Sequence, residues 1–182
     1  MWMASAQHDP VLAALLHPFV NGLLPWSTRA LFLRARAGIA GHGRGFVATQ
    51  PFRPEAVSLQ RAGIELLEED ALPAAAFPLV LVLPPRQREE ARALLARACA
   101  AVAPGGVVVA AVANDEGAKT REAELKQLAG GVATLSKHHC RVFWTLPGAR
   151  FDQALLHAWQ GLDAARRIVA EGRLGRLVGA SL

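Results

Sequence analysis

The sequence predicts a single α/β domain, a mostly parallel sheet that ends in an antiparallel hairpin, with helices on both faces. Two apolar runs of strand length, "FPLVLVLPP" and "VVVAAVAN", have the continuous hydrophobicity of parallel strands buried on both faces. Each is followed by a helical pattern, "RQREEARALLARACAAVAPGG" and "EGAKTREAELKQLAGG". Such alternation favours a parallel sheet. The later stretch "VATLSKHHCRVFWTLP" predicts two strands joined by a polar turn at residues 137–139.

The remaining elements follow from shorter signals along the chain. Residues 11–24 predict a helix broken near Pro18, and residues 30–33 a short strand. "GFVATQ" and "IELLEED" predict a second and a third strand, and the third has an acidic exit. Proline and glycine mark a helix at 54–63, and the Pro-Gly-Gly at 104–106 is expected to close the preceding helix. Residues 152–172 are expected to be helical.

Composition and length agree with one domain. The chain has 182 residues, of which 52% are hydrophobic and 19% charged, as in a folded globular protein. No apolar run reaches the roughly 18 residues of a membrane span, and the start lacks the basic region of a signal peptide. The two cysteines fit free thiols in a reducing compartment. We therefore expect a cytoplasmic protein without membrane contact.

The charge is basic but unspecific. The net charge is +5, and 17 Arg stand against 3 Lys. A basic balance favours phosphate-bearing partners without choosing one. High arginine and alanine content is also typical of a GC-rich coding sequence, so charge alone is weak evidence for RNA.

Several stretches together resemble a known family. They are "FVNGLLPW", "RALFLRARAG", "FRPEAVSLQRAG", "LVLVLPPRQREEARALL" and, most distinctively, "ANDEGAKT" followed by "SKHHCRVFW". Over about residues 18–145 the chain resembles the amino-terminal domain of bacterial 16S rRNA guanine-N2 methyltransferases, the methyltransferase small domain group. The resemblance implies the Rossmann-like fold of S-adenosylmethionine-dependent methyltransferases.

The resemblance also implies a domain organisation. In that family a degenerate amino-terminal domain precedes the catalytic domain, and it is implied to help in RNA binding and in folding its partner. We therefore expect residues 1–160 to form a methyltransferase-like domain and residues 161–182 a linker or tail toward a second domain. The expected partners are rRNA and a catalytic methyltransferase domain, and no oligomeric state is predicted.

Three positions test whether this chain binds the methyl donor. The glycine loop "GHGRG", with Gly41 and Gly43, comes late after the first strand, and arginines precede it where an acid is expected. Gln50 follows the second strand, where a carboxylate would bind the ribose. In "LPPR", Leu83 stands before Pro84 where the family's Asn-Pro-Pro motif has the amine-binding asparagine.

These departures predict a pseudo-methyltransferase domain with no catalytic residue and no cofactor of its own. Any cofactor site would lie near Gly41, Gly43, Gln50, Leu83 and Pro84. The alternative is an active S-adenosylmethionine-dependent RNA methyltransferase with atypical motifs, so enzymatic activity stays open at this point.

Other polar residues are candidates for RNA or partner-domain contact: Asn114, Lys119, Lys137 and Arg141. They are expected at the carboxyl end of the sheet and on the terminal hairpin. The alternative is that Asn114 and Thr120 cap the following helix while the basic groups are solvated. No metal site is predicted, because the adjacent residues 138–140 would alternate between faces of a strand.

Overall fold

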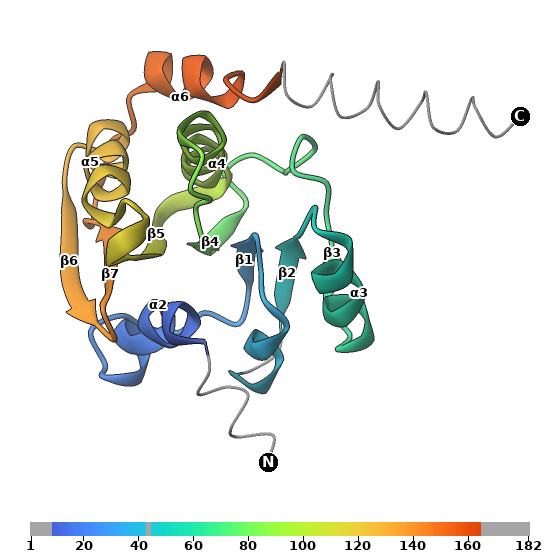
Figure 1. The fold of residues 1–182 in the computed structure, drawn as a ribbon. Helices are drawn as coiled ribbons and strands as arrows, with labels where there is room; N and C mark the ends of the chain where they lie inside the picture. Colours follow the sequence, from blue (N-terminus) through green and yellow to red (C-terminus); the bar gives the residue numbers. More distant parts are fainter. Residues whose placement is uncertain (1–8, 43–44, 165–182) are drawn as a thin grey trace, which may run out of the picture.

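The computed structural model describes residues 9–42 and 45–164. They form a seven-stranded sheet with the order β3-β2-β1-β4-β5-β7-β6 (Figure 1). Neighbouring strands are parallel except for β7, which is antiparallel to both β5 and β6. The predicted α/β fold with a terminal antiparallel hairpin is confirmed. The strands are β1 (Ala30–Leu33), β2 (Phe46–Thr49), β3 (Glu65–Leu66), β4 (Phe77–Val82), β5 (Val102–Ala113), β6 (Val132–Lys137) and β7 (Cys140–Thr145).

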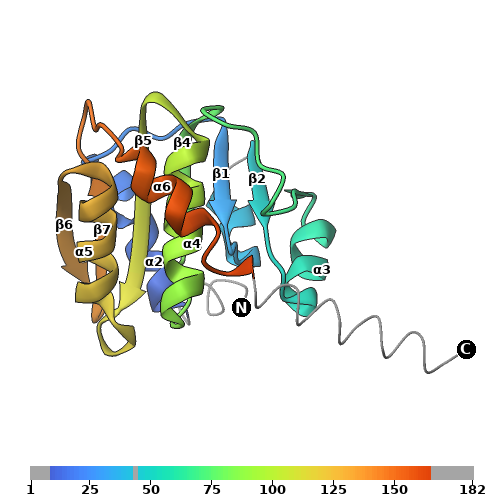
Figure 2. The ribbon, with the colours of Figure 1, turned by 90° about the horizontal axis from the view of Figure 1, so that it is seen from above.

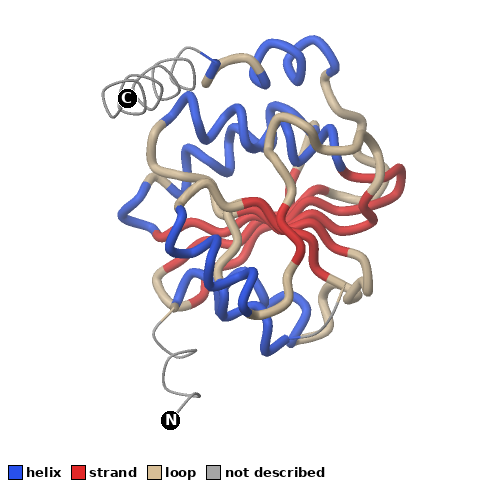
Figure 3. The backbone as a smooth tube through the Cα atoms, turned by 90° about the vertical axis from the view of Figure 1, so that its right-hand side faces the viewer, coloured by secondary structure: helices blue, strands red, loops and turns tan. Residues whose placement is uncertain are grey.

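Helices cover both faces of this sheet (Figures 2 and 3). One face carries α4, α5 and α6, and the other carries α2 with α3 and the 3-10 helix η1. The helices are α2 (Pro10–Val20), α3 (Arg53–Arg61), α4 (Arg88–Ala101), α5 (Ala118–Ala129) and α6 (Gln153–Gln160), and the 3-10 helices are η1 (Ala37–His42) and η2 (Asn114–Glu116). None of the helices in the described ranges is long and apolar enough to cross a bilayer.

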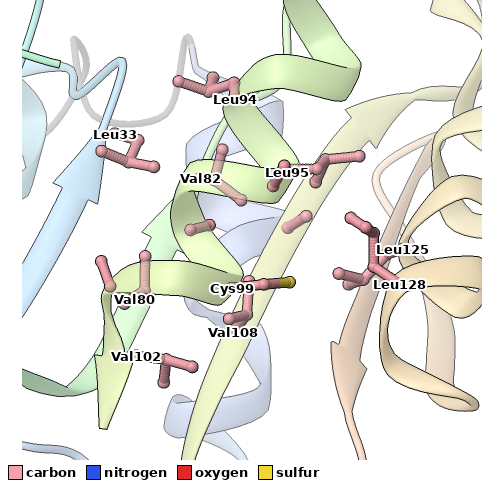
Figure 4. Close-up of a cluster of buried hydrophobic side chains, with 14 of the residues drawn as sticks. Leu33, Val80, Val82, Leu94, Leu95, Cys99, Val102, Val108, Leu125 and Leu128 are labelled. Atoms are coloured by element: carbon pink, nitrogen blue, oxygen red, sulfur yellow. The ribbon is translucent and has the colours of Figure 1, made fainter. Parts of the chain in front are cut away.

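Each face has its own hydrophobic core because side chains alternate along the strands. On the α4 side, Val80 and Val82 pack with Leu94, Leu95 and other residues of α4 and α5 (Figure 4). The other face is filled from β1, β2 and β4 of the sheet and from α2, α3 and η1. Its members include Leu15, Phe32, Ile39, Ala48, Leu59 and Leu81. Strands buried on both faces explain why the sequence shows continuous apolar runs there.

Helix α2 corrects the expected break at Pro18. The helix continues through Pro18 to Val20, and Pro18 itself is buried. Proline has no N–H to donate to the carbonyl four residues earlier, and burial of its ring in the core offsets the cost of that missing bond. Asp9 caps the other end, since its Oδ1 accepts a hydrogen bond from the N–H of Leu12 (3.1 Å).

Strand β5 corrects the expected end of the preceding helix. Helix α4 ends at Ala101, and β5 starts at the next residue, so the Pro-Gly-Gly at 104–106 lies inside the strand. Pairing of Val102 with Phe77 begins the strand early, and the register then shifts before Val107 pairs with Leu79. A Cβ on Gly106 would lie 2.7 Å from the carbonyl oxygen of Pro78, so glycine permits this close approach.

The hairpin between β6 and β7 turns through two residues, His138 and His139, within the polar turn predicted at 137–139, and Lys137 belongs to β6. His138 and His139 both have positive φ, 54° and 58°, the geometry of a type I′ turn. Farther along, α6 covers residues 153–160 of the expected helix at 152–172, and residues beyond 164 lie outside the described part. Nothing in the described ranges tests the predicted tail at 161–182 as a linker.

Candidate functional site

A pocket opens at the carboxyl edge of the sheet, beside the point where the strand order reverses between β1 and β4. It has a volume of about 310 Å³. Open α/β sheets bind their ligands at this place. The residues that line it come from the end of β5, from the segments after β1, β2, β4 and β5, and from α2 and α3. They include Val11, Arg34, Arg36, Gln50, Leu83 and Glu116.

Arg34 occupies the first position after β1 and pairs with Glu69. Its Nε lies 2.7 Å from Oε1 of Glu69, and its second terminal nitrogen lies 3.2 Å from Oε2. Thr49, at the end of β2, donates its hydroxyl to the same carboxylate (2.9 Å) and accepts the N–H of Arg34 (3.3 Å). These contacts therefore link the segment after β1, the end of β2 and the segment after β3. The opposite charges of Arg34 and Glu69 compensate each other.

The sequence reasoning missed Glu69. The acidic exit of "IELLEED" was the available signal, but the partner of Arg34 lies 35 residues away and is brought near by the parallel crossover. Arg34 also has a positive φ of 61°, an uncommon conformation for a residue other than glycine.

Arg36 has a similar arrangement with the start of α2. One of its terminal nitrogens lies 2.7 Å from Oδ1 of Asp9, the residue that caps α2. The guanidinium remains partly open, because 42% of the side chain is exposed. Helix α2 is thereby tied to the loop after β1, and Val11 of the same helix borders the pocket.

Gln50 lies at the end of β2, as expected, and its side-chain amide is engaged by the main chain. Its Nε2 donates to the carbonyl of Ala35 (2.8 Å), and its Oε1 accepts from the N–H of Phe52 (3.0 Å). An amide held on both sides braces the loops after β1 and β2. A ribose at this position would have to compete with those two bonds.

In the described part of the glycine loop, Gly45 serves the packing of the backbone. Gly41 lies in η1, and Gly43 lies outside the described residues. Gly45 has φ of +91°, and a Cβ there would meet the carbonyl oxygen of Thr28 at 1.8 Å. Its own carbonyl accepts a hydrogen bond from Ala30 (3.3 Å), which starts the pairing of β1 with β2. Gly45 is thus required by close backbone approach at the amino end of β2.

Leu83 and Pro84 border the pocket where β4 ends. Leu83 is buried, and its N–H donates to the carbonyl of Leu33 (3.3 Å), which extends the pairing of β4 with β1. Its side chain offers neither a donor nor an acceptor to an incoming amine. Of the five predicted cofactor-site residues, Gln50, Leu83 and Pro84 line this pocket, whereas Gly41 does not.

Asn114 and the hairpin tip meet at the same edge of the sheet. The N–H of Asn114 donates to the carbonyl of His139 (3.0 Å), and Lys137 lies on β6 just before the turn. Lys119 is exposed on the first turn of α5. The alternative that Asn114 or Thr120 caps α5 is wrong, because Gly117 is the N-cap residue and no side chain caps it.

Arg141 on β7 points to α5. Its guanidinium lies 2.5 Å from Oε2 of Glu122, and 26% of the side chain is exposed. The structure therefore brings Asn114 and Lys137 together at the hairpin and gives Arg141 a carboxylate partner. Contact of these residues with RNA or a partner domain stays a prediction.

The two thiols are buried. Desolvation raises the pKa of Cys99 far above its ordinary value. The pKa of Cys140 is raised by desolvation and by the carboxylates of Asp9, Asp115 and Glu116. Thiols with raised pKa values are poor nucleophiles at neutral pH. Within the described ranges, no three His, Cys, Asp or Glu side chains come together as a group that could hold a metal ion.

Comparison with known proteins identifies the fold. No protein-family model matches the chain, and no curated protein sequence matches it. Among solved structures, the T. thermophilus 16S rRNA N2 methyltransferase RsmC, in complex with AdoMet and guanosine, is similar with a TM-score of 0.61 and 18% identity. The match covers 80% of this chain and 41% of that one, so the matched part spans about two fifths of that enzyme.

Two further enzymes show the same likeness. The N-methyltransferase NodS of Bradyrhizobium japonicum, with S-adenosyl-L-homocysteine, has a TM-score of 0.55 at 14% identity over 81% of this chain and 88% of that one. The ribosomal protein L11 methylase of Lactobacillus delbrueckii has a TM-score of 0.55 at 12% identity, covering 71% and 75%. The chain therefore has the Rossmann-like fold of S-adenosylmethionine-dependent methyltransferases, and at such identities the likeness extends to the fold alone.

Proposed function

We propose that this chain is a pseudo-methyltransferase domain, related to the rRNA guanine-N2 methyltransferases, that contacts RNA and transfers no methyl group itself. The observation that carries the proposal is the Arg34–Glu69 pair, which joins the segments that follow β1 and β3 at the carboxyl edge of the sheet. In this fold the methyl donor is expected at that edge. Glu69, a carboxylate at this edge, is already bound by Arg34 and Thr49, so it is not available to stabilise the positive sulfonium of S-adenosylmethionine.

The amine-binding side of the pocket supports the same conclusion. Methylation of a nucleobase amine requires an acceptor that orients the nitrogen lone pair toward the methyl group. Leu83 supplies none, and its main-chain N–H is bonded to β1. Gln50 Oε1 already accepts one main-chain N–H and carries no negative charge, so it is a weaker acceptor for the ribose hydroxyls than the expected carboxylate.

RNA is the favoured partner because of charge and of the similar enzymes. The net charge is +5, and Lys119 is exposed at the sheet edge near the hairpin. RsmC acts on 16S rRNA, and its fold is similar. Asn114, Lys119, Lys137 and Arg141 are the expected contacts, with a catalytic methyltransferase domain as the second partner.

Calorimetric titration with S-adenosylmethionine tests the non-catalytic assignment. We expect no saturable heat for the folded chain, whereas micromolar binding would contradict the proposal. RNA contact is tested by salt-dependent binding, which should weaken for Lys119→Ala and Lys137→Ala. The salt slope should fall by about 0.7 for each phosphate that a variant no longer neutralises. If the chain shows no salt-dependent binding to RNA, the proposed RNA contact is wrong and contact with a partner domain is favoured.

An active enzyme with atypical motifs is the second candidate, because a pocket of about 310 Å³ remains at the expected place. Transfer of a labelled methyl group to RNA by this chain alone would establish it. Leu83→Asn restores the motif asparagine and should then raise the rate. Equal inactivity of Leu83→Asn and the wild type would contradict this candidate.

A further inference from the structure

The pocket at the carboxyl edge has a composition that points to a particular ligand. We infer that it holds one nucleotide of single-stranded RNA, with the base against Phe52 and the two prolines and a phosphate at Arg86 and Arg36. All five side chains line the same pocket of about 310 Å³. The inference rests on the proposed function, contact with RNA, and adds the site on the chain at which one nucleotide binds.

Phe52 provides an exposed aromatic ring on a fixed backbone. Its side chain is 63% exposed, although apolar residues of this size are usually buried. Its N–H is held by Gln50 (3.0 Å), and its carbonyl accepts the N–H of Ala56 (3.0 Å) in the first turn of α3. A ring presented in this way loses little entropy when a base stacks on it. Stacking of unpaired bases on aromatic rings is a main mode of RNA recognition.

Pro84 and Pro85 form an apolar wall of the same pocket, directly after β4. Their rings are rigid and carry no donor, so they complement the flat apolar face of a base. Strands β2, β1 and β4 are neighbours in the sheet and parallel, which brings the loops after them to one edge. Phe52 and the prolines therefore reach the pocket from two different loops that the sheet holds in place.

Two guanidinium groups at this pocket suit a phosphate. Arg86 is exposed in the loop after β4. Arg36, after β1, pairs with Asp9 through one terminal nitrogen and keeps 42% of its side chain exposed. Arginine binds phosphate through several parallel N–H donors, so a partly engaged group still has donors to offer.

Carboxylates distinguish a nucleotide from a simple anion. Glu55 and Glu116 also line the pocket, and they would repel a free polyphosphate. The amino and imino groups of a base are hydrogen-bond donors that a carboxylate accepts. The pocket therefore combines cations for a phosphate, apolar side chains for the faces of a base, and carboxylates that can accept hydrogen bonds from its edge. The volume lies at the lower end of small-ligand sites and suffices for one such unit.

The test measures fluorescence anisotropy of a labelled single-stranded RNA of mixed sequence, about 12 nucleotides long so that it spans one ordinary site. Phe52→Ala should weaken binding at least about fivefold, the effect of losing one stacked base. Arg86→Ala should reduce the salt slope by about 0.7, one phosphate contact. Leu146→Ala and Arg150→Ala are matched controls, because both residues are exposed and outside the pocket. They should bind within about twofold of wild type.

The outcomes separate this inference from the proposed function. If the wild type binds RNA and Phe52→Ala and Arg86→Ala match their controls, the pocket assignment is wrong and RNA contact elsewhere stands. If the wild type binds no RNA, both are wrong. Displacement of RNA by S-adenosylmethionine would contradict the non-catalytic assignment. Phe52→Leu, which keeps an apolar side chain without the ring, should also weaken binding, and thermal melting verifies that each variant folds.

Discussion

Glu69, in the segment after β3, accepts two hydrogen bonds, at 2.7 and 3.2 Å, from the guanidinium of Arg34, which follows β1. The two side chains are 21% and 15% exposed, so solvent screens the pair only in part. Thr49 adds a third bond to the carboxylate. This cluster of three residues fixes the loops that would otherwise be free to receive a ligand.

Replacement of Arg34 should destabilise the chain in a way that depends on the new residue. Arg34→Ala removes both charge-assisted bonds and should lower the free energy of unfolding by about 1–3 kcal/mol. Arg34→Gly removes the same bonds but relieves the positive φ of 61°, so it should be about 1 kcal/mol more stable than Arg34→Ala. Urea titration of the two variants provides the comparison. Equal stabilities would show that the backbone at this position carries no strain.

The glycine loop gives a second comparison between two glycines. Gly45→Ala should destabilise the chain by about 3 kcal/mol, because its φ is +91° and its Cβ would overlap the Thr28 carbonyl at 1.8 Å. Gly41→Ala meets nothing within 4 Å and should change stability by less than about 1 kcal/mol. Thermal melting of both variants measures the difference. A tolerated alanine at position 45 would contradict the structural role assigned to that glycine.

The segment that follows α6 is held to α4 by a buried ion pair. Both terminal nitrogens of Arg97 lie 2.9 Å from the carboxylate oxygens of Asp163, and each side chain is 6% exposed. Arg97→Ala leaves a buried carboxylate and should cost about 3–5 kcal/mol. Arg97→Lys keeps the charge but not the planar fork, so its cost should be smaller.

The matched control for Arg97 is Arg150→Ala, an exposed arginine at which we expect a change within about 0.5 kcal/mol. Chemical denaturation measures all three variants. If Arg97→Ala proves as mild as the control, α6 is held by its apolar contacts alone.

The buried thiols predict a loss of stability at alkaline pH. Burial raises the pKa of Cys99 and of Cys140 in the folded chain above the ordinary value of 9.0. Above about pH 9 the unfolded chain releases these protons while the folded chain retains them, so unfolding is favoured. Stability is therefore complete below the unfolded pKa and falls as pH rises beyond it, by at most about 1.4 kcal/mol per pH unit for each thiol.

Urea titration between about pH 7 and pH 10 measures this loss, and the sequence contains no tyrosine that would titrate in the same range. Cys99→Ala should reduce the alkaline slope. A slope unchanged by Cys99→Ala would assign the effect to other groups. A thiol reagent at neutral pH should label neither cysteine until the chain unfolds.

Much of the fold follows from local patterns. The strands at 30–33, 46–49 and 77–82 and the hairpin at 132–145 occur where apolar runs and turn residues predict them. The errors fall where tertiary contacts outweigh local rules. Pro18 remains in α2, where its ring is buried, and the Pro-Gly-Gly lies inside β5 because that strand pairs with β4 on both sides of it.

The candidate site divides in the same way. Gln50 and Leu83 could be identified from their positions after strands, and the structure places both beside the pocket. Phe52 lines the same pocket but gives no distinctive signal in the sequence, since an exposed phenylalanine cannot be told from a buried one by its neighbours in the chain. Glu69 could not be identified as a site residue from the sequence, because its partner Arg34 is 35 residues away in the chain.

The alternation of strands and helices, and with it a mostly parallel sheet, can be predicted from the amino-acid sequence alone. Those features depend on the spacing of apolar residues along the chain, which is a local property of the sequence. Other features appear only in the folded chain. Arg34 pairs with Glu69, both ends of the Gln50 amide bond to the main chain, and Phe52 lines the pocket with its own backbone held by hydrogen bonds. These contacts join separate loops, and their energies exist only after parallel strands have brought the loops to one edge.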